Sequence, residues 1–473
     1  VYTYLRIIFM FKTILLIAFS LFVSTTAFAQ LPELNIERPF RRCGTSMLLE
    51  RDRAENNAMT RAISTSENYV PHSGSITVPV ILVNFKDVKF TINNPVKAFD
   101  QFFNGPKQIE LGYGNALNHG SVAEYFYDMS GGNFNVKFKI YGPVTVDNNE
   151  TYYGGTNKNN NKDENPRQLV KDAIAKLQAS SEKITDDSEF SSDNSTIDIV
   201  YIVYAGIGQN IGGDSTTVWA CTGPFSTTFA NKKTRWFSIA SELSNASVDS
   251  NGKLSSRGTI PAIAGIGVTC HEFSHSLGLP DLYPAKLPYY PSNQEMELWD
   301  LMDGGEYSGS YQGYCPTAYT AFEKNEMGWP VRIKELSESQ PVTMTESTLD
   351  GGTAYKIVNP SNSSEYFMLE NIKRSGWNSE QCGQGLLVYH VNRPSGDLSL
   401  SSDFNNTQGY PRMAVVPADG ITLSTDDAKN YSQYISSLTG DLFPGTGNMS
   451  PNTLNVTELS DAKPQPNFCW YDS

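Results

Sequence analysis

The most informative stretch of the sequence is VTCHEFSHSLGLPD, which runs from Val268 to Asp281. His271 and His275 are four residues apart, so on a helix they project from one face, about one turn apart. Imidazole nitrogens placed in this way can bind one zinc ion at about 2.0–2.1 Å. Glu272 stands beside the first histidine, where its carboxylate can reach a metal-bound water without binding the metal. The pattern predicts a catalytic zinc site with Glu272 as the general base.

The residues after His275 predict the third ligand. Gly278 suits a left-handed helix cap, and Pro280 prevents the helix from resuming, so the chain must turn and can bring Asp281 back toward the metal. The chain has only five histidines, which favours an oxygen ligand over a third imidazole. Asp281 could instead cap the helix, and the competing carboxylates are Glu295, Glu297 and Glu306.

Three interpretations compete with a zinc peptidase. A chance HExxH pattern arises on the order of one time in a hundred in a chain of this length, but it normally lacks the glycine and the acid that follow here. A binding protein with decayed catalysis would usually have lost the base, and Glu272 is present. Spacing alone leaves open a zinc hydrolase that acts on something other than a peptide.

The start of the chain has the features of a secretory signal peptide. Lys12 supplies positive charge, residues 13–23 are almost all apolar, and residues 27–29 (Ala-Phe-Ala) fit the small-x-small cleavage rule. Cleavage after residue 29 would make Gln30 the first residue. Met10 is a natural start, so we place no weight on residues 1–9. Because no later stretch approaches about 18 apolar residues, we expect a secreted protein without a membrane span.

Length and composition predict several structural units. At about 150 residues per domain, 473 residues correspond to two to four units. After the signal peptide (residues 1–29), residues 30–70 are polar and arginine-rich, as in a pro-segment. We expect a catalytic domain over residues 75–334 and a β-rich C-terminal domain over residues 335–473. The last residues resemble an unfinished strand, as expected of a truncated version of a longer protein, although the sequence alone does not decide this.

Short patterns predict the elements around the motif. Residues 78–83 and 197–204 are apolar runs typical of buried strands, and apolar residues recur at helical spacing behind Pro166. The apolar residues 260–268 favour a buried helix, and residues 316–327 favour another helix that is opened by a proline. Beyond residue 335 the pattern changes to short strands. The predicted fold class is α+β, a mixed sheet with an active-site helix followed by a β-rich domain.

Charge and cysteine content limit the partners. A formal net charge of −14 argues against nucleic-acid binding, and protein or peptide substrates remain. The six cysteines permit disulfides but are too sparse for a disulfide-rich fold, and their pairing cannot be deduced from the sequence. The loops at residues 147–165 and 180–195 are most simply solvated; calcium binding there is an alternative, although their spacing matches no complete calcium motif.

The sequence HEFSHSLGLPDLY resembles the zinc motif of the immune inhibitor A family, a group of secreted bacterial metallopeptidases in the metzincin clan. Segments at 78–87, 120–134, 197–206, 365–370 and 385–390 are similar to stretches that recur in that family. The resemblance covers roughly residues 75–450. It implies a metzincin-like catalytic domain in which Met302 forms the methionine turn beneath the metal. The chain departs from the family at Ala220 and Cys221, where a polar residue is expected.

Residues 41–44 (Arg-Arg-Cys-Gly) resemble the cysteine switch of other secreted metzincins, in which a pro-segment thiolate occupies the water position on zinc. A soft thiolate is a good zinc ligand, and the adjacent glycine lets the backbone approach closely. Cys43 is therefore a candidate latency switch, although it could equally form a disulfide or be unpaired. Activation cuts are plausible at Arg53-Ala54 and Arg61-Ala62.

Overall fold

The computed structural model describes most of the chain from residue 69 onward. The described residues are 69–105, 117–155, 163, 165–251, 253–255, 257–284, 295–309, 312–338, 340–346, 352–393, 404–405, 410–421, 431–443 and 470, together with backbone strands at 4–10, 14–20 and 458–459.

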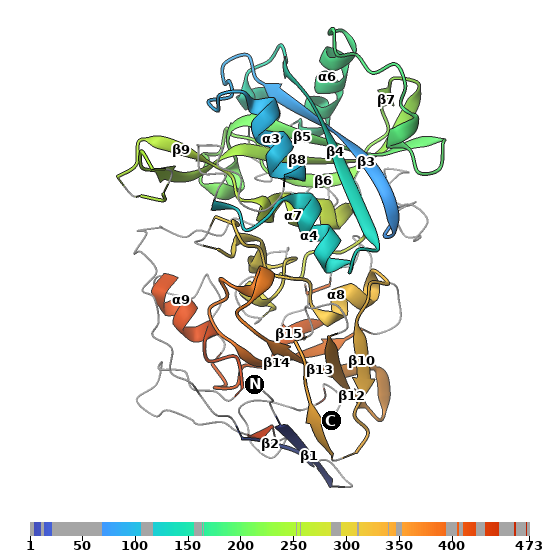
Figure 1. Ribbon diagram of the computed structural model, residues 1–473, viewed down its shortest axis with the longest axis vertical. Helices are drawn as coiled ribbons and strands as arrows, with labels where there is room; N and C mark the ends of the chain where they lie inside the picture. Colours follow the sequence, from blue (N-terminus) through green and yellow to red (C-terminus); the bar gives the residue numbers. More distant parts are fainter. Residues whose placement is uncertain are drawn as a thin grey trace.

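A seven-stranded sheet forms the half of the molecule that holds the HExxH motif (Figure 1). Its main path runs β4-β3-β5-β8-β6, and β7 and β9 also pair with β8. Strands β4, β3, β5 and β8 are parallel, whereas β6 lies antiparallel to β8, so the sheet is mixed as expected. The bounds are β3 Gly74–Asn84, β4 Phe134–Thr145, β5 Thr196–Ile207, β6 Cys221–Pro224, β7 Thr228–Phe229, β8 Lys232–Val248 and β9 Ile260–Ile263.

Helices cover both faces of this sheet, which explains why its central strands are apolar on both sides. In β3, Val80 and Leu82 belong to the core shared with α3, α4 and α7, while Ile81 and Val83 belong to the core shared with α6. The alternation follows from the period of two along a strand. The strands predicted at 78–83 and 197–204 and the helix predicted behind Pro166 are confirmed. The helices are α3 Pro95–Asn104, α4 Val122–Met129, α5 Glu150–Gly154, α6 Pro166–Gln178 and α7 Ile266–Ser276.

A five-stranded sheet, ordered β10-β12-β13-β14-β15, forms the other half (Figure 1). Its strands alternate between two cores. Leu387 and Tyr389 of β14 join the core of α7, and Leu386 and Val388 face a separate cluster. The bounds are β10 Arg332–Glu335, β12 Thr353–Asn359, β13 Asn362–Ile372, β14 Gly385–Asn392 and β15 Met413–Val415, with helices α8 Ala321–Glu326 and α9 Tyr431–Leu438.

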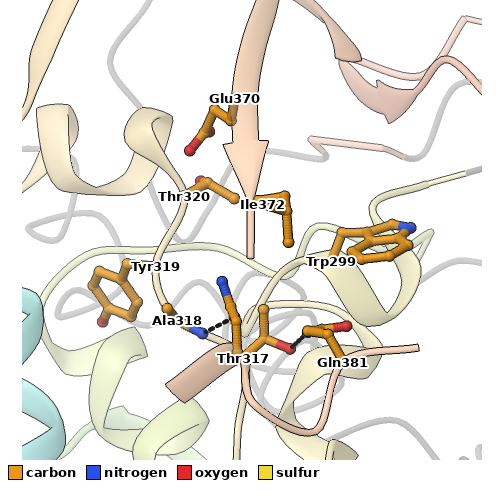
Figure 2. Close-up of a pocket in the computed structure, with 9 residues that line it drawn as sticks. Trp299, Thr317, Ala318, Tyr319, Thr320, Glu370, Ile372 and Gln381 are labelled. Atoms are coloured by element: carbon orange, nitrogen blue, oxygen red, sulfur yellow. Dashed lines mark hydrogen bonds between the residues drawn. The ribbon is translucent and has the colours of Figure 1, made fainter. Parts of the chain in front are cut away.

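Polar contacts join the two halves. Trp299 Nε1 donates to Asp441 Oδ2 (2.8 Å), and the backbone N–H of Ala321 donates to Glu370 Oε1 (2.9 Å). Figure 2 shows a small cavity at this junction, where Gln381 donates to Thr317 Oγ1 (2.5 Å). The cavity measures about 10 Å³, room for one water molecule. The two sheets therefore share one continuous core.

Two helix predictions need correction. Residues 260–263 form strand β9, and the helix begins only at Ile266, after Gly265 in an extended conformation. The helix predicted over 316–327 begins at Ala321, because Thr320 caps it: the Thr320 hydroxyl accepts the N–H of Glu323, whose carboxylate accepts the N–H of Thr320. A capping box is a stronger start signal than the proline that precedes it.

The remaining elements are short. Strands β1 Tyr4–Met10, β2 Ile14–Ser20, β11 Pro341–Thr343 and β16 Glu458–Leu459 form a third sheet in the order β11-β1-β2-β16. The 3₁₀ turns are η3 Ser188–Phe190, η4 Gln209–Ile211, η5 Glu297–Trp299, η6 Gly304–Tyr307 and η7 Gly376–Asn378. Within the described part of the chain, no helix combines the length and apolarity needed to cross a membrane.

Candidate metal centre and active site

Helix α7 carries the motif and is buried along its whole length. Its first amides are satisfied from outside: Ile266 N–H donates to Asn118 Oδ1 (2.9 Å), and Gly267 N–H donates to the Gly313 carbonyl (2.9 Å). Only glycine fits at residue 267, since a Cβ there would lie 1.8 Å from the Glu306 carbonyl oxygen. This close approach brings the loop after the methionine turn against the active-site helix.

The helix ends as the sequence predicts. Gly278 has a φ of +108°, a left-handed conformation that glycine adopts without strain. Beyond Pro280, the N–H of Leu282 donates to the Met302 carbonyl (2.9 Å). This bond ties the chain just after Asp281 to the segment that holds Met302.

The turn brings three predicted ligands together. The Nε2 atoms of His271 and His275 lie 3.1 Å apart, and Asp281 Oδ1 lies 3.3 Å from each of them. Two ligand atoms at about 2.0–2.1 Å from a tetrahedral zinc ion would be about 3.3–3.4 Å apart. The triangle therefore has the size that zinc requires. Among the residues that the structure describes, this is the one group of three or more histidine, cysteine or acidic side chains close enough to share an ion.

Backbone carbonyls orient both imidazoles. His271 Nδ1 lies 2.9 Å from the Leu301 carbonyl oxygen, and His275 Nδ1 lies 2.7 Å from that of Leu279. A carbonyl can only accept, so each Nδ1 carries the proton and each Nε2 presents a lone pair toward Asp281. Three acceptor atoms then face one another, an arrangement that a cation stabilises. The donor set thus fits a divalent metal such as zinc.

Charge at the site is consistent with this arrangement. Burial by itself raises the pKa of Asp281, but the adjacent imidazoles of His275 and His271 in their protonated form outweigh it and hold that pKa well below its usual value. Asp281 is therefore ionised, as a metal ligand must be.

Glu272 lies next to the ligands and is fully buried. Its backbone carbonyl accepts the hydroxyl of Thr222 on β6 (2.7 Å), which fixes the edge of the seven-stranded sheet beside α7. No local sequence pattern predicts this contact, because Thr222 is about 50 residues from Glu272 and only sheet pairing brings it near.

The competing carboxylates lie elsewhere. Glu306 Oε2 is 3.9 Å from His271 Nδ1, on the side of the ring away from Asp281. Burial raises the pKa of Glu306 to about 8; the nearby His271 opposes that rise, while Glu272 and Asp281 add to it. Glu297 accepts the hydroxyl of Tyr434 (2.7 Å) in the junction with α9. Glu295, Glu297 and Glu306 all lie outside the group of candidate ligands.

The methionine and tyrosine after the motif are both packed. Met302 is fully buried in the core that contains α7. Tyr307 forms a small cluster with Ala220 and Val268. Ala220 is one of the two residues at which the chain departs from the family pattern, and its small side chain leaves room for the Tyr307 ring. The Tyr307 ring thus packs between α7 and the residue that precedes β6.

Acidic side chains in the loop at 180–195 form ion pairs with other residues of the protein. Within the loop, Asp187 pairs with Lys232 (2.7 Å) and Asp193 pairs with Arg235 (2.5 Å), and Ser192 donates its hydroxyl to Asp198 of β5 (2.8 Å). These contacts give no support to a calcium site there. No disulfide joins any two of Cys221, Cys270, Cys315 and Cys382, the cysteines that the structure describes. Cys43 lies outside the described residues.

Comparison with known proteins decides the family. Residues 72–329, more than half of the chain, match the catalytic domain of immune inhibitor A peptidase M6. The chain belongs to the immune inhibitor A peptidase M6 family. The resemblance predicted from the zinc motif is confirmed, and the matched region is the catalytic domain of that peptidase family.

Two relatives illustrate the M6 membership. The pre-pro-metalloprotease PrtV of Vibrio cholerae serotype O1 is 28% identical over 263 residues, which cover 50% of this chain and 28% of the relative. Immune inhibitor A of Bacillus thuringiensis subsp. alesti is 26% identical over 280 residues, which cover 52% of this chain and 39% of the relative. The match thus spans well under half the length of either relative.

Proposed function

We propose that this member of the M6 family is a secreted zinc-dependent endopeptidase. The observation that carries the proposal is the triangle of His271 Nε2, His275 Nε2 and Asp281 Oδ1, whose sides measure 3.1–3.3 Å. The Nδ1 atoms of both histidines are hydrogen-bonded to backbone carbonyls. The M6 match over the same residues supports a peptide as the substrate.

The roles of the residues follow from the geometry. Zinc held by His271, His275 and Asp281 would polarise a scissile carbonyl and lower the pKa of a water molecule to about 7. Glu272 accepts the proton of the attacking water and returns it to the leaving amine. The burial of the site excludes bulk water and strengthens each of these electrostatic interactions.

Strand β6 is the best candidate for positioning a substrate. It ends the main path of the seven-stranded sheet, it is antiparallel to β8, and Thr222 fixes it to α7 beside the metal ligands. An extended peptide can pair with such a strand through backbone hydrogen bonds. We therefore place the substrate along β6, in a metzincin-like domain over residues 75–334 with Met302 beneath the metal. Residues 335–473 form the β-rich domain in this scheme.

Export and latency complete the proposal. The predicted signal peptide would leave Gln30 as the first residue, which mass spectrometry of the exported protein would show. The pro-segment at 30–70 would keep the enzyme inactive through Cys43, as the resemblance to a cysteine switch implies. Activity of an uncleaved Cys43→Ala chain would support that switch, and its persistent inactivity would count against it.

Metal removal tests the proposed function. The processed chain should lose hydrolysis of casein when a chelator strips the metal, and about one zinc per chain should restore it. His119→Ala serves as a control, because His119 lies against Trp377 at ring centroids 4.9 Å apart and outside the ligand group. Hydrolysis that survives complete metal removal would contradict the proposal, and zinc binding without hydrolysis of any protein would favour a binding protein or another hydrolase.

A further inference from the structure

The segment Tyr69–His72, here called the N-terminal strap, lies against the C-terminal end of α7. The N–H of Val70 donates to the Ser276 carbonyl (3.0 Å), and His72 Nε2 donates to the Leu277 carbonyl (2.6 Å). The last carbonyls of a helix have no partner within the helix. The strap therefore supplies donors to this helix end from a segment about 200 residues away.

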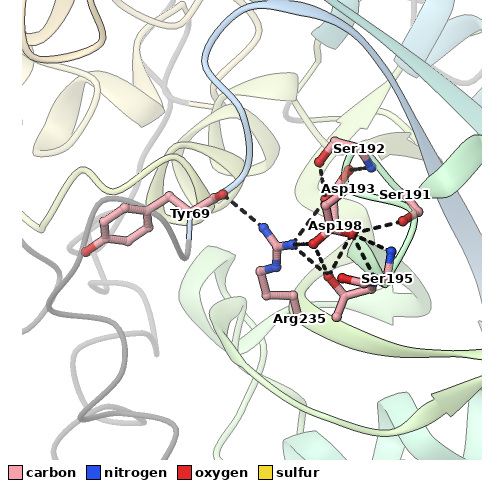
Figure 3. A network of polar contacts seen from close by, with 8 residues as sticks. Tyr69, Ser191, Ser192, Asp193, Ser195, Asp198 and Arg235 are labelled. Carbon is pink, nitrogen blue, oxygen red and sulfur yellow. Dashed lines mark hydrogen bonds and ion pairs between the residues drawn. The ribbon is translucent and has the colours of Figure 1, made fainter.

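The first strap residue, Tyr69, is fixed by strand β8. Its ring stacks on Trp236, with centroids 5.8 Å apart and planes 25° apart, and its carbonyl accepts Arg235 Nη1 (3.4 Å). Figure 3 shows that the same guanidinium pairs with Asp193 on its other side. Arg235 thus links the strap to the acidic loop before β5.

The Tyr69 ring also covers the turn that follows α7. A Cβ built on Gly278 would come within 3.1 Å of that ring, so the ring lies directly over the glycine. The other end of the strap is held as well, because Trp329 Nε1 donates to the His72 carbonyl (2.7 Å). The strap is thus anchored on β8, α7 and the end of the M6 match.

We infer that the N-terminal strap is a positioning segment for the metal site. Gly278 is the residue at which the chain leaves the helix of His271 and His275 and turns toward Asp281. A strap that bonds Ser276 and Leu277 and covers Gly278 fixes the third ligand relative to the first two. This inference rests on the proposed function.

The inference places Tyr69 and Val70 in the mature catalytic unit, although the sequence assigned them to the end of the pro-segment. Val70 is only 1% exposed, and its N–H bonds the active-site helix, as expected for a permanent part of the domain. Activation should therefore leave the strap attached.

Paired substitutions in the full chain test the strap. His72→Ala removes the donor to Leu277, whereas His72→Gln retains an amide donor; Tyr69→Ala removes the ring over Gly278, whereas Tyr69→Phe retains it. The readout is the zinc dissociation constant of metal-depleted protein, measured by competition with a coloured chelator. Groups that support a metal ligand contribute about 10–100-fold to affinity. We expect the two alanine variants to weaken zinc binding about tenfold and the conservative variants to stay within about twofold. Equal affinity in all four would overturn the inference.

Hydrogen exchange tests the role of the strap without metal. The N–H groups of Gly278 and Leu279 donate to the carbonyls of His275 and Ser274 (3.0 and 3.2 Å), so their hydrogen exchange reports on the turn. Exchange should accelerate in His72→Ala and return to normal in His72→Gln. If the wild type bound no zinc, the proposed function would fail. The exchange pattern would still show whether the strap holds the turn at Gly278 in place. A mature protein that begins after His72 and binds zinc normally would also overturn it.

Discussion

At the scale of single residues, backbone carbonyls rather than side chains orient the two imidazoles. Leu301 and Leu279 provide these carbonyls, and both belong to segments joined by the bond from Leu282 N–H to the Met302 carbonyl. The ligand geometry therefore depends on the path of the backbone after Gly278 and around Met302. Substituting a neighbouring side chain will disturb the site less than shifting either turn.

The third ligand can be distinguished from its nearest competitor by isosteric changes. Asp281→Asn should weaken zinc binding at least tenfold, because it removes the charge of the one oxygen ligand in the triangle. Glu306→Gln should change it much less, because Glu306 lies 3.9 Å from a ring nitrogen that already bonds Leu301. Chelator competition measures both. Loss of zinc in Glu306→Gln with retention in Asp281→Asn would reverse the assignment.

A buried acid at the start of α5 predicts a pH-dependent stability. Burial raises the pKa of Glu150 to about 7; the Val218 N–H opposes that rise, and Asp87 and Asp214 add to it. Because the folded pKa exceeds the unfolded value, the carboxyl favours folding below about pH 4.5, and that contribution is lost as the pH rises through 7. Glu150→Gln should therefore gain stability over the wild type, on the order of 2 to 3 kcal/mol, between pH 5 and pH 8.5.

Urea denaturation at the two pH values measures this gain. The exposed strand residue Glu335 offers a control, since Glu335→Gln should change stability by less than about 0.5 kcal/mol at either pH. A Glu150→Gln variant that gains no stability at high pH would show that the wild-type carboxylate is better solvated than its burial implies.

Sequence reasoning at this scale predicted three residues that the structure brings together, His271, His275 and Asp281, because their positions depend on local spacing. HExxH fixes two histidines and a base on one helix, and the Gly278 and Pro280 signals fix the turn to Asp281. The places of Glu306, Thr222 and Tyr69 could not be predicted in the same way. Each approaches α7 through tertiary contacts across 30 to 200 residues, and no local pattern encodes such distances.

At the scale of elements, periodicity identified the central strands and α6 but misplaced two helix starts. Residues 260–268 are apolar enough for either a strand or a helix, and pairing with β8 makes 260–263 a strand. At α8 the capping box of Thr320 and Glu323 sets the start five residues after the proline. A short apolar run has no periodicity that would distinguish a strand from the first turn of a helix.

Helix α4 offers a test of capping next to the site. Ser121 Oγ accepts the N–H of Glu124 (3.2 Å), and α4 packs on α7 through Phe126 and Phe273, whose ring centroids lie 5.0 Å apart. Ser121→Ala should lower the free energy of unfolding by about 1 kcal/mol and leave zinc content unchanged. Ser250→Ala, in an exposed turn, should stay within about 0.5 kcal/mol. Thermal denaturation compares them, and equal melting temperatures would contradict the capping role.

At the scale of the whole molecule, the hydrophobic core does not stop where the family match stops. The match ends at residue 329, yet Leu387, Tyr389 and Met413 pack in the core that contains α7. The sequence predicted two domains from the change of pattern near residue 335. It could not show that the second sheet packs into the core that contains α7, because contacts between segments far apart in the chain leave no local signature.

Removing residues 335–473 should therefore destabilise the catalytic part. The cut exposes the core beneath β13 and β14 and breaks the bond from Trp299 to Asp441. We expect an insoluble fragment, or one that melts at least about 10 °C below the full chain, because several large buried side chains lose their partners. Expression and thermal denaturation measure this. A soluble fragment with unchanged melting temperature and casein hydrolysis would show that the two sheets are independent.

The most direct test of Glu272 as the general base of a zinc peptidase is casein hydrolysis by the processed chain and by its Glu272→Gln variant, with zinc counted in both. We expect about one zinc per chain in each protein and a loss of rate of at least about 100-fold in the variant, because the proposed ligands remain and only the proton acceptor is gone. A zinc-loaded Glu272→Gln variant that cleaves casein at the wild-type rate would contradict this role.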